Sequence, residues 1–221
     1  MVCQKSSSPV IFFDVDGTLI LRTSCEYLLL RHLLIRGNFP LTNLVHALVW
    51  NLGKARTFFY SLHFNKLWYR GYSVDGLNKH IDAVFPSICR HISQGAINEM
   101  RRAHDGGSRI VLLSAAPDIL VRRIGEYIGY HEVVATSFEI HNTIYTGRVT
   151  GIVPYAAGKI AAASAYAASL GVRLSDCTAY ANAGSDIPLL ESVGTAYAVN
   201  PSVGLQKHAM SKGWSILRFN T

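Results

Sequence analysis

The stretch VIFFDVDGT, at positions 10–18 of this 221-residue chain, decides the fold. Its first four residues form an uninterrupted apolar run, which predicts a short strand buried on both faces, as in a parallel sheet. The run ends on Asp14 and Asp16, two aspartates separated by one residue. Gly17 follows them and permits a sharp turn of the backbone. We therefore expect both carboxylates to face one small site at the end of this strand.

Short apolar runs alternate with helical segments through the second half of the chain. After the strand at 10–13, we expect further strands at 110–113, 133–136, 178–180 and 196–199, with a hairpin over 138–149. We expect helices between them at 117–127, 156–170, 186–192 and 201–211. This alternation predicts an α/β fold, a Rossmann-like parallel sheet with helices on both faces.

An insertion separates the first strand from the rest of the predicted sheet. From residue 23 to about residue 94 the apolar positions recur at helical spacing, with breaks at glycine and proline, which predicts an α-helical cap. The expected division is a core of residues 1–21 and 95–221 and a cap of residues 22–94. Between Arg22 and Arg102 there are 11 Lys or Arg residues and only 4 Asp or Glu residues, which accounts for the whole formal charge of +7.

The same segment is rich in aromatic residues and includes Trp50 and Trp68. A basic, aromatic segment favours an anionic partner, such as a phosphorylated substrate, a nucleic acid or an acidic membrane surface. The alternative is a helical module whose aromatic side chains form its core and whose cations are solvated. None of the motif spacings of nucleic-acid-binding domains occurs here, so we expect no nucleic-acid partner.

Composition excludes several classes of protein. With 49% hydrophobic and 16% charged residues, the chain can bury a sizeable core and is not expected to be disordered. The 4 cysteines show no CxxC spacing, which argues against a disulfide scaffold or a zinc cluster. No apolar segment is long enough for a signal peptide or a bilayer span, so we expect a cytoplasmic protein with no integral membrane contact.

Polar residues mark three further places where a ligand could bind. Ser114 comes directly after the apolar run at 110–113, and a hydroxyl beside the backbone N–H groups of a helix start can hold a phosphate. Lys159 lies near the start of a predicted helix and offers a mobile positive charge. Asn182 and Asp186 follow a later strand and carry oxygen donors. Because ligands bind beyond the carboxyl ends of parallel strands, we expect these residues to share one site with the two aspartates.

In their order and spacing these motifs resemble those of the haloacid dehalogenase (HAD) superfamily. The sequence DVDGT at 14–18 matches the first motif, Ser114 the second, Lys159 the third and residues 182–186 the fourth. The C-terminal part resembles the phosphoserine-phosphatase-like branch, the subfamily IB hydrolases with a C1-type helical cap. That branch carries its cap between the first and second motifs, where the basic insertion lies.

The resemblance implies a two-step phosphoryl transfer that depends on Mg²⁺. Asp14 would be the nucleophile, and Asp16 would act first as the general acid and then as the general base. The phosphoryl oxygens would be held by Thr18, Ser114, the N–H of Ala115 and Lys159. The metal would be held by the carboxylate of Asp14, the backbone carbonyl of Asp16, and the fourth-motif residues Asn182 and Asp186.

Two positions depart from the family pattern. The fourth motif usually begins Gly-Asp, and here Ala181-Asn182 stands in its place, so a neutral amide replaces a metal-binding carboxylate. We expect this change to cost at least about 10-fold in metal affinity or activity. Phosphoserine phosphatases carry a glutamate nine residues after the nucleophile, where this chain has Thr23, and Glu26 does not match that spacing. We therefore expect that phosphoserine is not the preferred substrate.

The sequence thus predicts a Mg²⁺-dependent phosphatase, a phosphoric monoester hydrolase that acts through an aspartyl-phosphate. Its expected substrate is a small phosphorylated metabolite, and the aromatic cap suits one with an aromatic or apolar portion. The alternative, which Asn182 favours, is a catalytically weakened protein of the same fold that binds a phosphorylated ligand or a protein partner. A third hypothesis is that the basic cap docks on an anionic membrane surface.

Overall fold

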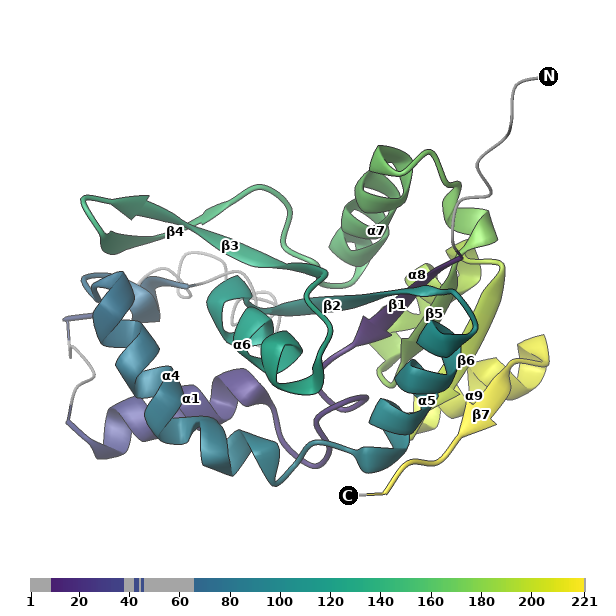
Figure 1. Ribbon diagram of the computed structural model, residues 1–221, viewed down its shortest axis with the longest axis horizontal. Helices are drawn as coiled ribbons and strands as arrows, with labels where there is room; N and C mark the ends of the chain where they lie inside the picture. Colours follow the sequence, from purple (N-terminus) through teal and green to yellow (C-terminus); the bar gives the residue numbers. More distant parts are fainter. Residues whose placement is uncertain (1–8, 38–41, 44, 46–65, 221) are drawn as a thin grey trace.

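The computed structural model describes residues 9–37, 42, 43, 45 and 66–220. Its centre is a seven-stranded sheet with the strand order β4-β3-β2-β1-β5-β6-β7 (Figure 1). The strands are β1 (Val10–Asp14), β2 (Arg109–Pro117), β3 (Val133–His141), β4 (Ile144–Thr150), β5 (Thr178–Ala181), β6 (Thr195–Val199) and β7 (Ser215–Leu217). Neighbouring strands are parallel except β3 and β4, which confirms the predicted Rossmann-like α/β fold. The strand order reverses at β1, where ligands usually bind in such sheets.

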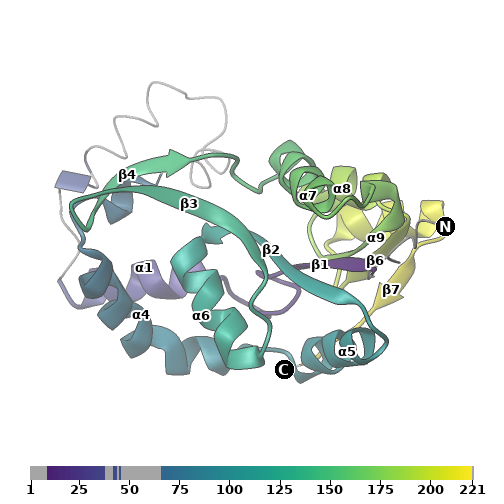
Figure 2. The same cartoon turned by 45° about the horizontal axis from the view of Figure 1, so that its top comes forward.

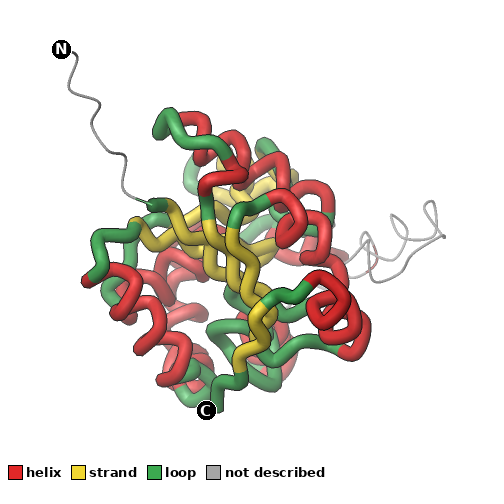
Figure 3. Tube along the Cα trace, turned by 90° about the vertical axis from the view of Figure 1, so that its right-hand side faces the viewer, coloured by secondary structure: helices red, strands yellow, loops and turns green. Residues whose placement is uncertain are grey.

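Helices cover both faces of the sheet (Figures 2 and 3). They are α1 (Cys25–Ile35), α4 (Val74–Cys89), α5 (Gln94–Asp105), α6 (Asp118–Ile128), α7 (Ala157–Ser169), α8 (Ile187–Ser192) and α9 (Val203–Lys212). Side chains alternate along β1, because Ile11 and Phe13 join the apolar cluster under α5 and α6, whereas Val10 and Phe12 join the cluster under α7, α8 and α9. A strand buried in this way on both faces needs the continuous apolar run that the sequence shows.

Two strands differ from the sequence prediction. The strand expected at 133–136 and the hairpin expected from 138 are continuous, because β3 pairs first with β2 in parallel and then with β4 in antiparallel orientation. Thr136 and Phe138 are both buried within β3, so the polar residues at this point do not end the strand. The sequence analysis also missed β7, which has only three residues and is too short to show a period.

The insertion after β1 packs against the core through a continuous apolar cluster. Leu29 of α1 and Ile81 of α4 belong to the same buried cluster as Leu112 of β2 and Leu120 of α6. The described helices of the insertion therefore share an apolar cluster with the sheet and α6. The boundaries of the cap at residues 22–94 stay a prediction.

The β3–β4 hairpin lies along the start of α4 and binds it through the backbone (Figure 1). The N–H of Tyr145 donates to the carbonyl of Tyr72, and the N–H of Gly71 donates to the carbonyl of Tyr145, both at 2.9 Å. The N–H of Val74 donates to the carbonyl of Thr143, also at 2.9 Å. The described part of the insertion is therefore held by the hairpin as well as by α6.

The most basic and aromatic part of the insertion, including Trp50, Lys54, Arg56 and the aromatic residues at 58–64, lies outside the described residues. A role of this segment in binding a substrate or a membrane surface therefore stays a prediction. Within the part of the chain that the structure describes, no helix has the length and apolar character needed to span a bilayer.

Candidate active site

A pocket of about 240 Å³ lies at the carboxyl end of β1. Its walls come from the carboxyl-terminal parts of β1 and β2 and from the segments that follow β1, β4 and β5. Every residue that the sequence assigns to the site, except Thr18, lines it: Asp14, Asp16, Ser114, Ala115, Lys159, Asn182 and Asp186. The other lining residues are Ser24, Glu26, Ala116, Pro154, Tyr155, Ala183 and Ser185. The segments converge here because the carboxyl ends of parallel strands meet at one edge of the sheet.

Asp14 is the last residue of β1, and its buried carboxylate is held from two sides. Nζ of Lys159 donates to Oδ1 at 2.6 Å, and Oγ1 of Thr18 donates to Oδ2 at 2.9 Å. A hydroxyl has one proton to donate, so Thr18 cannot also donate to a phosphate while it holds Asp14. The contact that the structure shows for Thr18 is with the carboxylate of Asp14, and its expected contact with a phosphate stays a prediction.

The turn after β1 brings Asp16 into the same pocket. Gly17 has a φ of +89°, in the region that favours glycine, and a Cβ at this position would overlap the amide of Asn182. Oδ1 of Asp16 accepts a hydrogen bond from the N–H of Cys25, the first residue of α1, at 2.8 Å. The glycine thus allows the close approach of two loops, and the start of α1 orients the Asp16 carboxylate.

Lys159 lies in the first turn of α7 and connects two carboxylates. Its Nζ is 2.6 Å from Oδ1 of Asp14 and 2.7 Å from Oδ1 of Asp186, and all three side chains are buried. Gly158 makes this placement possible, because a Cβ there would overlap the carbonyl of Val153. The first turn of α7 can therefore approach the preceding loop closely enough to bring the ammonium group to the end of β1.

Burial and neighbouring charges set the ionisation of the site. Burial, helped by the charges of Asp186 and Asp16 and opposed by Lys159, raises the pKa of Asp14 to about 7. Burial also raises the pKa of Asp16, although the hydrogen bond from the N–H of Cys25 favours the charged carboxylate and opposes this shift. Burial disfavours the charged form of Lys159, but Asp14 and Asp186 outweigh this effect and raise its pKa. Lys159 therefore contacts two carboxylates, and the carboxylate of Asp16 lies in the same pocket. When all three carboxylates are ionised, the site has an excess of negative charge.

Ser114 and Ala115 lie where β2 loses its regular pairing with β3, between Leu113 and Pro117. Oγ of Ser114 accepts from the N–H of Ala116 at 3.1 Å, a role that does not use the hydroxyl proton. The carbonyl of Ala115 accepts from Oγ1 of Thr136 at 2.7 Å, which fixes this irregular segment. Ser114 can therefore donate its proton to a ligand in the pocket.

Asn182 and Asp186 occupy different places in the pocket. Oδ1 of Asp186 accepts from Lys159, and Oδ2 accepts from the N–H of Ala183 at 3.1 Å, so both of its oxygens already have donors. Asn182 is half-buried and packs against Gly17, beside the turn that carries Asp16. Of these two side chains, Asn182 is the one that lies against the turn between the two aspartates.

The oxygen donors of the pocket fit a Mg²⁺ ion that is held jointly with a substrate. Across the described residues, no three His, Cys, Asp or Glu side chains are grouped as a metal site. Mg²⁺ prefers hard oxygen ligands, keeps several waters and is usually bound through one or two carboxylates plus substrate phosphates. The carboxylates of the pocket and the amide of Asn182 supply such oxygens, and the excess negative charge favours a cation.

Glu26 also lines the pocket, although the sequence analysis set it aside because of its spacing. It lies in the first turn of α1, and Lys66 donates to both of its carboxylate oxygens, at 2.7 and 2.6 Å. The position of Glu26 at the start of α1 could have indicated that it borders the site. The first residue of this helix, Cys25, donates a hydrogen bond to Asp16, so the first turn of α1 lies beside the pocket. Nothing in the sequence marks Lys66, which is 40 positions away.

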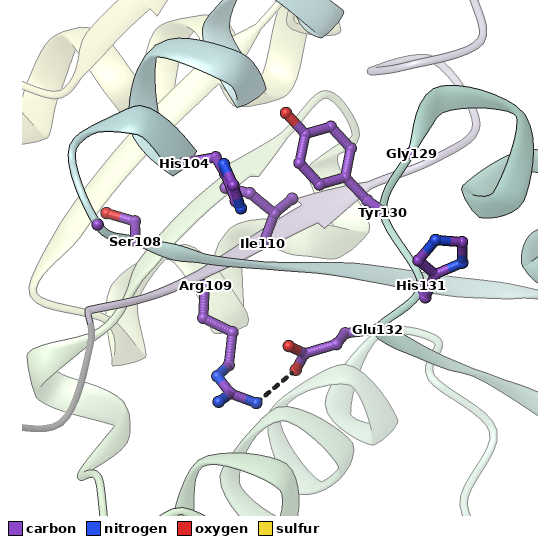
Figure 4. A pocket seen from close by; sticks show the side chains of 9 residues that line it. His104, Ser108, Arg109, Ile110, Gly129, Tyr130, His131 and Glu132 are labelled. Atoms are coloured by element: carbon purple, nitrogen blue, oxygen red, sulfur yellow. Dashed lines mark hydrogen bonds and ion pairs between the residues drawn. The ribbon is translucent and has the colours of Figure 1, made fainter.

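A second hollow, of about 390 Å³, lies at the amino end of β2 (Figure 4). This hollow is larger than the pocket at the end of β1, but its charged pair is exposed to solvent. Nη1 of Arg109 is 3.0 Å from Oε2 of Glu132, and the two side chains are 40% and 36% exposed. Water screens such pairs, so they perturb each other little. The hollow has no counterpart to the buried carboxylates at the end of β1, and we assign the functional site to the smaller pocket.

Comparison with known proteins identifies the family of the chain. The family model of haloacid dehalogenase-like hydrolases matches residues 11–191. The chain is 30% identical over 216 residues to a phosphoserine phosphatase of Mycobacterium tuberculosis, a match that covers 94% of this chain and 70% of that protein.

Two solved structures share the fold. A protein of unknown function from Bordetella pertussis Tohama I superposes with a TM-score of 0.79 at 23% identity, covering 96% of this chain and 99% of that one. A phosphoserine phosphatase in its apo form superposes with a TM-score of 0.65 at 19% identity, covering 96% of this chain and 93% of that one.

Proposed function

Because the chain belongs to the haloacid dehalogenase-like hydrolase family, as a phosphatase of its phosphoserine-phosphatase-like branch, we propose that it hydrolyses a small phosphomonoester with Mg²⁺ through an aspartyl-phosphate on Asp14. The observation that carries this proposal is the environment of Asp14. Its carboxylate is buried and held by Lys159 and Thr18, in a pocket that Asp16 and Ser114 also line. A positioned nucleophile beside a group that can exchange protons is the arrangement that covalent catalysis needs.

In the first step, a carboxylate oxygen of Asp14 forms a bond to phosphorus while the bond from phosphorus to the alcohol oxygen breaks. Asp16 donates a proton to that alcohol oxygen, and its raised pKa, which burial causes, helps it to carry the proton. Ser114, the N–H of Ala115 and Lys159 hold the phosphoryl oxygens. These groups are positioned before the reaction begins, so they stabilise the developing charge without reorganisation.

In the second step, water hydrolyses the aspartyl-phosphate. Asp16, now ionised, takes a proton from the water molecule as its oxygen forms a bond to phosphorus. The bond between phosphorus and Asp14 breaks, and the carboxylate returns with its hydrogen bonds to Lys159 and Thr18. Each cycle thus consumes one water and releases the alcohol and inorganic phosphate.

Asp14, Asp16 and Asn182 are the residues that would hold Mg²⁺, whereas Asp186 acts mainly through its bond to Lys159. When bound, the ion neutralises charge between the Asp14 carboxylate and the phosphate. The pKa of Asp14, which burial raises to about 7, shows that the buried site disfavours the charged carboxylate, and a bound cation would favour it.

The test is phosphate release from a panel of phosphomonoesters, with and without Mg²⁺. We expect Mg²⁺-dependent release that falls at least about 10³-fold in Asp14→Asn, because the nucleophile is lost. Asp105→Asn makes the same chemical change at an exposed position and should leave the rate unchanged. Release that persists in Asp14→Asn, or no release across the panel, would contradict the proposal.

A second candidate function is supported by Asn182 alone. The family has a carboxylate at this position, and its replacement by an amide weakens the expected metal site. In that case the protein binds a phosphomonoester without hydrolysing it efficiently. Saturable binding of an ester together with no phosphate release would favour this second function.

A further inference from the structure

The carboxylate of Glu26 lines the pocket but takes no part in the proposed phosphoryl transfer. Its side chain is 14% exposed, and Lys66 donates to both of its oxygens, at 2.7 and 2.6 Å. The side chain of Lys66 is fully buried and does not line the pocket. A ligand therefore meets the carboxylate of Glu26 first, with the matching ammonium group behind it.

The hydrogen bonds that the carboxylate of Glu26 accepts from the described residues leave a lone pair on Oε2 that can accept a hydrogen bond from a ligand. The hydroxyl of Tyr69 donates to Oε1 at 3.2 Å, so among the contacts of the described residues Oε1 accepts two bonds and Oε2 accepts one. A carboxylate offers about four lone-pair sites, which leaves one on Oε2 for a donor that enters the pocket.

The charge of Glu26 is already matched by that of Lys66. An ammonium group of a ligand at this position would lose its hydration and meet a neutral ion pair, with no net opposite charge to compensate the loss. A hydroxyl group loses less hydration, because it is neutral, and it needs only the acceptor on Oε2. The Glu26–Lys66 pair thus distinguishes two donors of similar size by their charge.

We propose that the Glu26–Lys66 pair makes this pocket select phosphomonoesters whose alcohol carries a neutral hydroxyl group over those that carry an ammonium group in the same place. This inference rests on the proposed phosphatase function. The pocket of about 240 Å³ has room for a phosphoryl group together with a short alcohol. The substrate class is a phosphorylated short polyol.

Two nearly isosteric esters test the inference: 2-hydroxyethyl phosphate and 2-aminoethyl phosphate. They differ only in the terminal hydroxyl or ammonium group, so the ratio of their kcat/KM values reports on that group alone. We expect a ratio of at least about 10 in favour of the hydroxyl ester, the effect of one unfavourably buried charge. A ratio of one or below in the unmutated protein would overturn the proposal without any variant.

Variants of Lys66 show whether the pair causes the preference. Lys66→Met leaves the charge of Glu26 unmatched, so the ratio should shift at least about 10-fold toward the ammonium ester. Lys66→Arg keeps the charge and should keep the preference. The double variant with Glu26→Gln and Lys66→Met has no charge at either position, so the preference for the hydroxyl ester should return. Were Lys66 merely structural, Lys66→Met would lower both kcat/KM values equally.

Binding separates this inference from the proposed function. Titration calorimetry of both esters against Asp14→Asn with Mg²⁺ needs no turnover. Tighter binding of the hydroxyl ester without turnover in the unmutated protein would overturn the phosphatase function but support the selectivity. If both esters are turned over and the ammonium ester binds as tightly as the hydroxyl ester or more tightly, the selectivity is overturned but the phosphatase function is not. If neither ester binds, the selectivity is overturned as well.

Discussion

Lys159 and Lys66 are both buried lysines that donate to carboxylates lining the same pocket, but they leave different net charges. Nζ of Lys159 lies 2.6 Å from Asp14 and 2.7 Å from Asp186, so two carboxylates share one ammonium group. Lys66 donates to Glu26 alone among the carboxylates of the described residues. When Asp14 is ionised, the first cluster has a net negative charge, whereas the second is neutral.

The difference gives the two clusters different tasks. A buried negative excess at the end of β1 favours a cation and fits the groups that act on a phosphoryl ester. A neutral pair in the wall favours a neutral part of the substrate. Burying a lysine costs free energy in both places, and the number of carboxylates around it decides what the cluster attracts.

Removing Lys159 is expected to have the largest effect. Lys159→Met takes away a phosphoryl-binding charge and leaves Asp14 and Asp186 unmatched, so kcat/KM for 2-hydroxyethyl phosphate should fall by about 10²–10³-fold. The unmatched buried charges should also lower the free energy of unfolding by roughly 3–5 kcal/mol, measured with urea.

Lys66→Met is the matched control, because it removes the other buried lysine. Its kcat/KM for the same ester should fall less than about 10-fold, since Glu26 does not touch the reacting atoms. Equal losses in the two variants would show that the two lysines do not differ in the way described.

Changing Asn182 tests the metal side of the charged cluster. Asn182→Asp restores a carboxylate of almost the same shape, so the Mg²⁺ concentration for half-maximal phosphate release should fall at least about 10-fold. Asn78→Asp, at an exposed position of α4, is the control and should not change the Mg²⁺ dependence. An unchanged Mg²⁺ dependence in Asn182→Asp would mean that this amide does not limit the site.

Stability should depend on pH through the same cluster. Burial raises the pKa of Asp14 from 3.8 to about 7, so between these values the folded protein holds a proton that the unfolded chain releases. The free energy of unfolding should therefore fall as pH rises from about 4 to 7 without divalent cations. The raised pKa of Asp16 acts in the same direction.

Urea unfolding at pH 5 and pH 8 measures this dependence. Asp14→Asn should show a smaller difference between the two pH values, and Mg²⁺ should restore stability to the unmutated protein at pH 8. If Asp14→Asn had the same pH dependence as the unmutated protein, Asp14 would not carry the raised pKa.

The smallest effect is expected at the exposed ion pair of the second hollow. Arg109→Gln removes the charged partner of Glu132, which keeps its hydrogen bond from Tyr166. Exposed pairs contribute about 1 kcal/mol or less, so the free energy of unfolding should barely change. Phosphate release should remain as in the unmutated protein. A large loss of turnover would show that this hollow takes part in the function.

The sequence could predict those parts of the fold and the site that depend on local pattern and on strand ends. The apolar run before Asp14 indicates a strand buried on both faces, and the polar residues that follow it mark the site. Ser114 and Asn182 could be expected in the same pocket, because they follow other strands of one parallel sheet. These inferences need no knowledge of long-range packing.

Other parts of the site depend on packing that no local pattern encodes. Lysines are almost never fully buried, so residue type alone would place Lys66 at the surface, and its partner Glu26 lies 40 positions away. For Thr18, the motif shows that a hydroxyl is near the site, but only its orientation decides whether it meets the phosphate or Asp14.

The most direct test of the account is to trap the covalent intermediate. The protein is quenched with acid during turnover of 2-hydroxyethyl phosphate with Mg²⁺, and its peptides are analysed by mass spectrometry. We predict one phosphoryl group on the peptide that contains Asp14, and its loss when Mg²⁺ is omitted. Phosphate release with a phosphoryl group on Ser114 instead, or with none on the chain, would contradict the account.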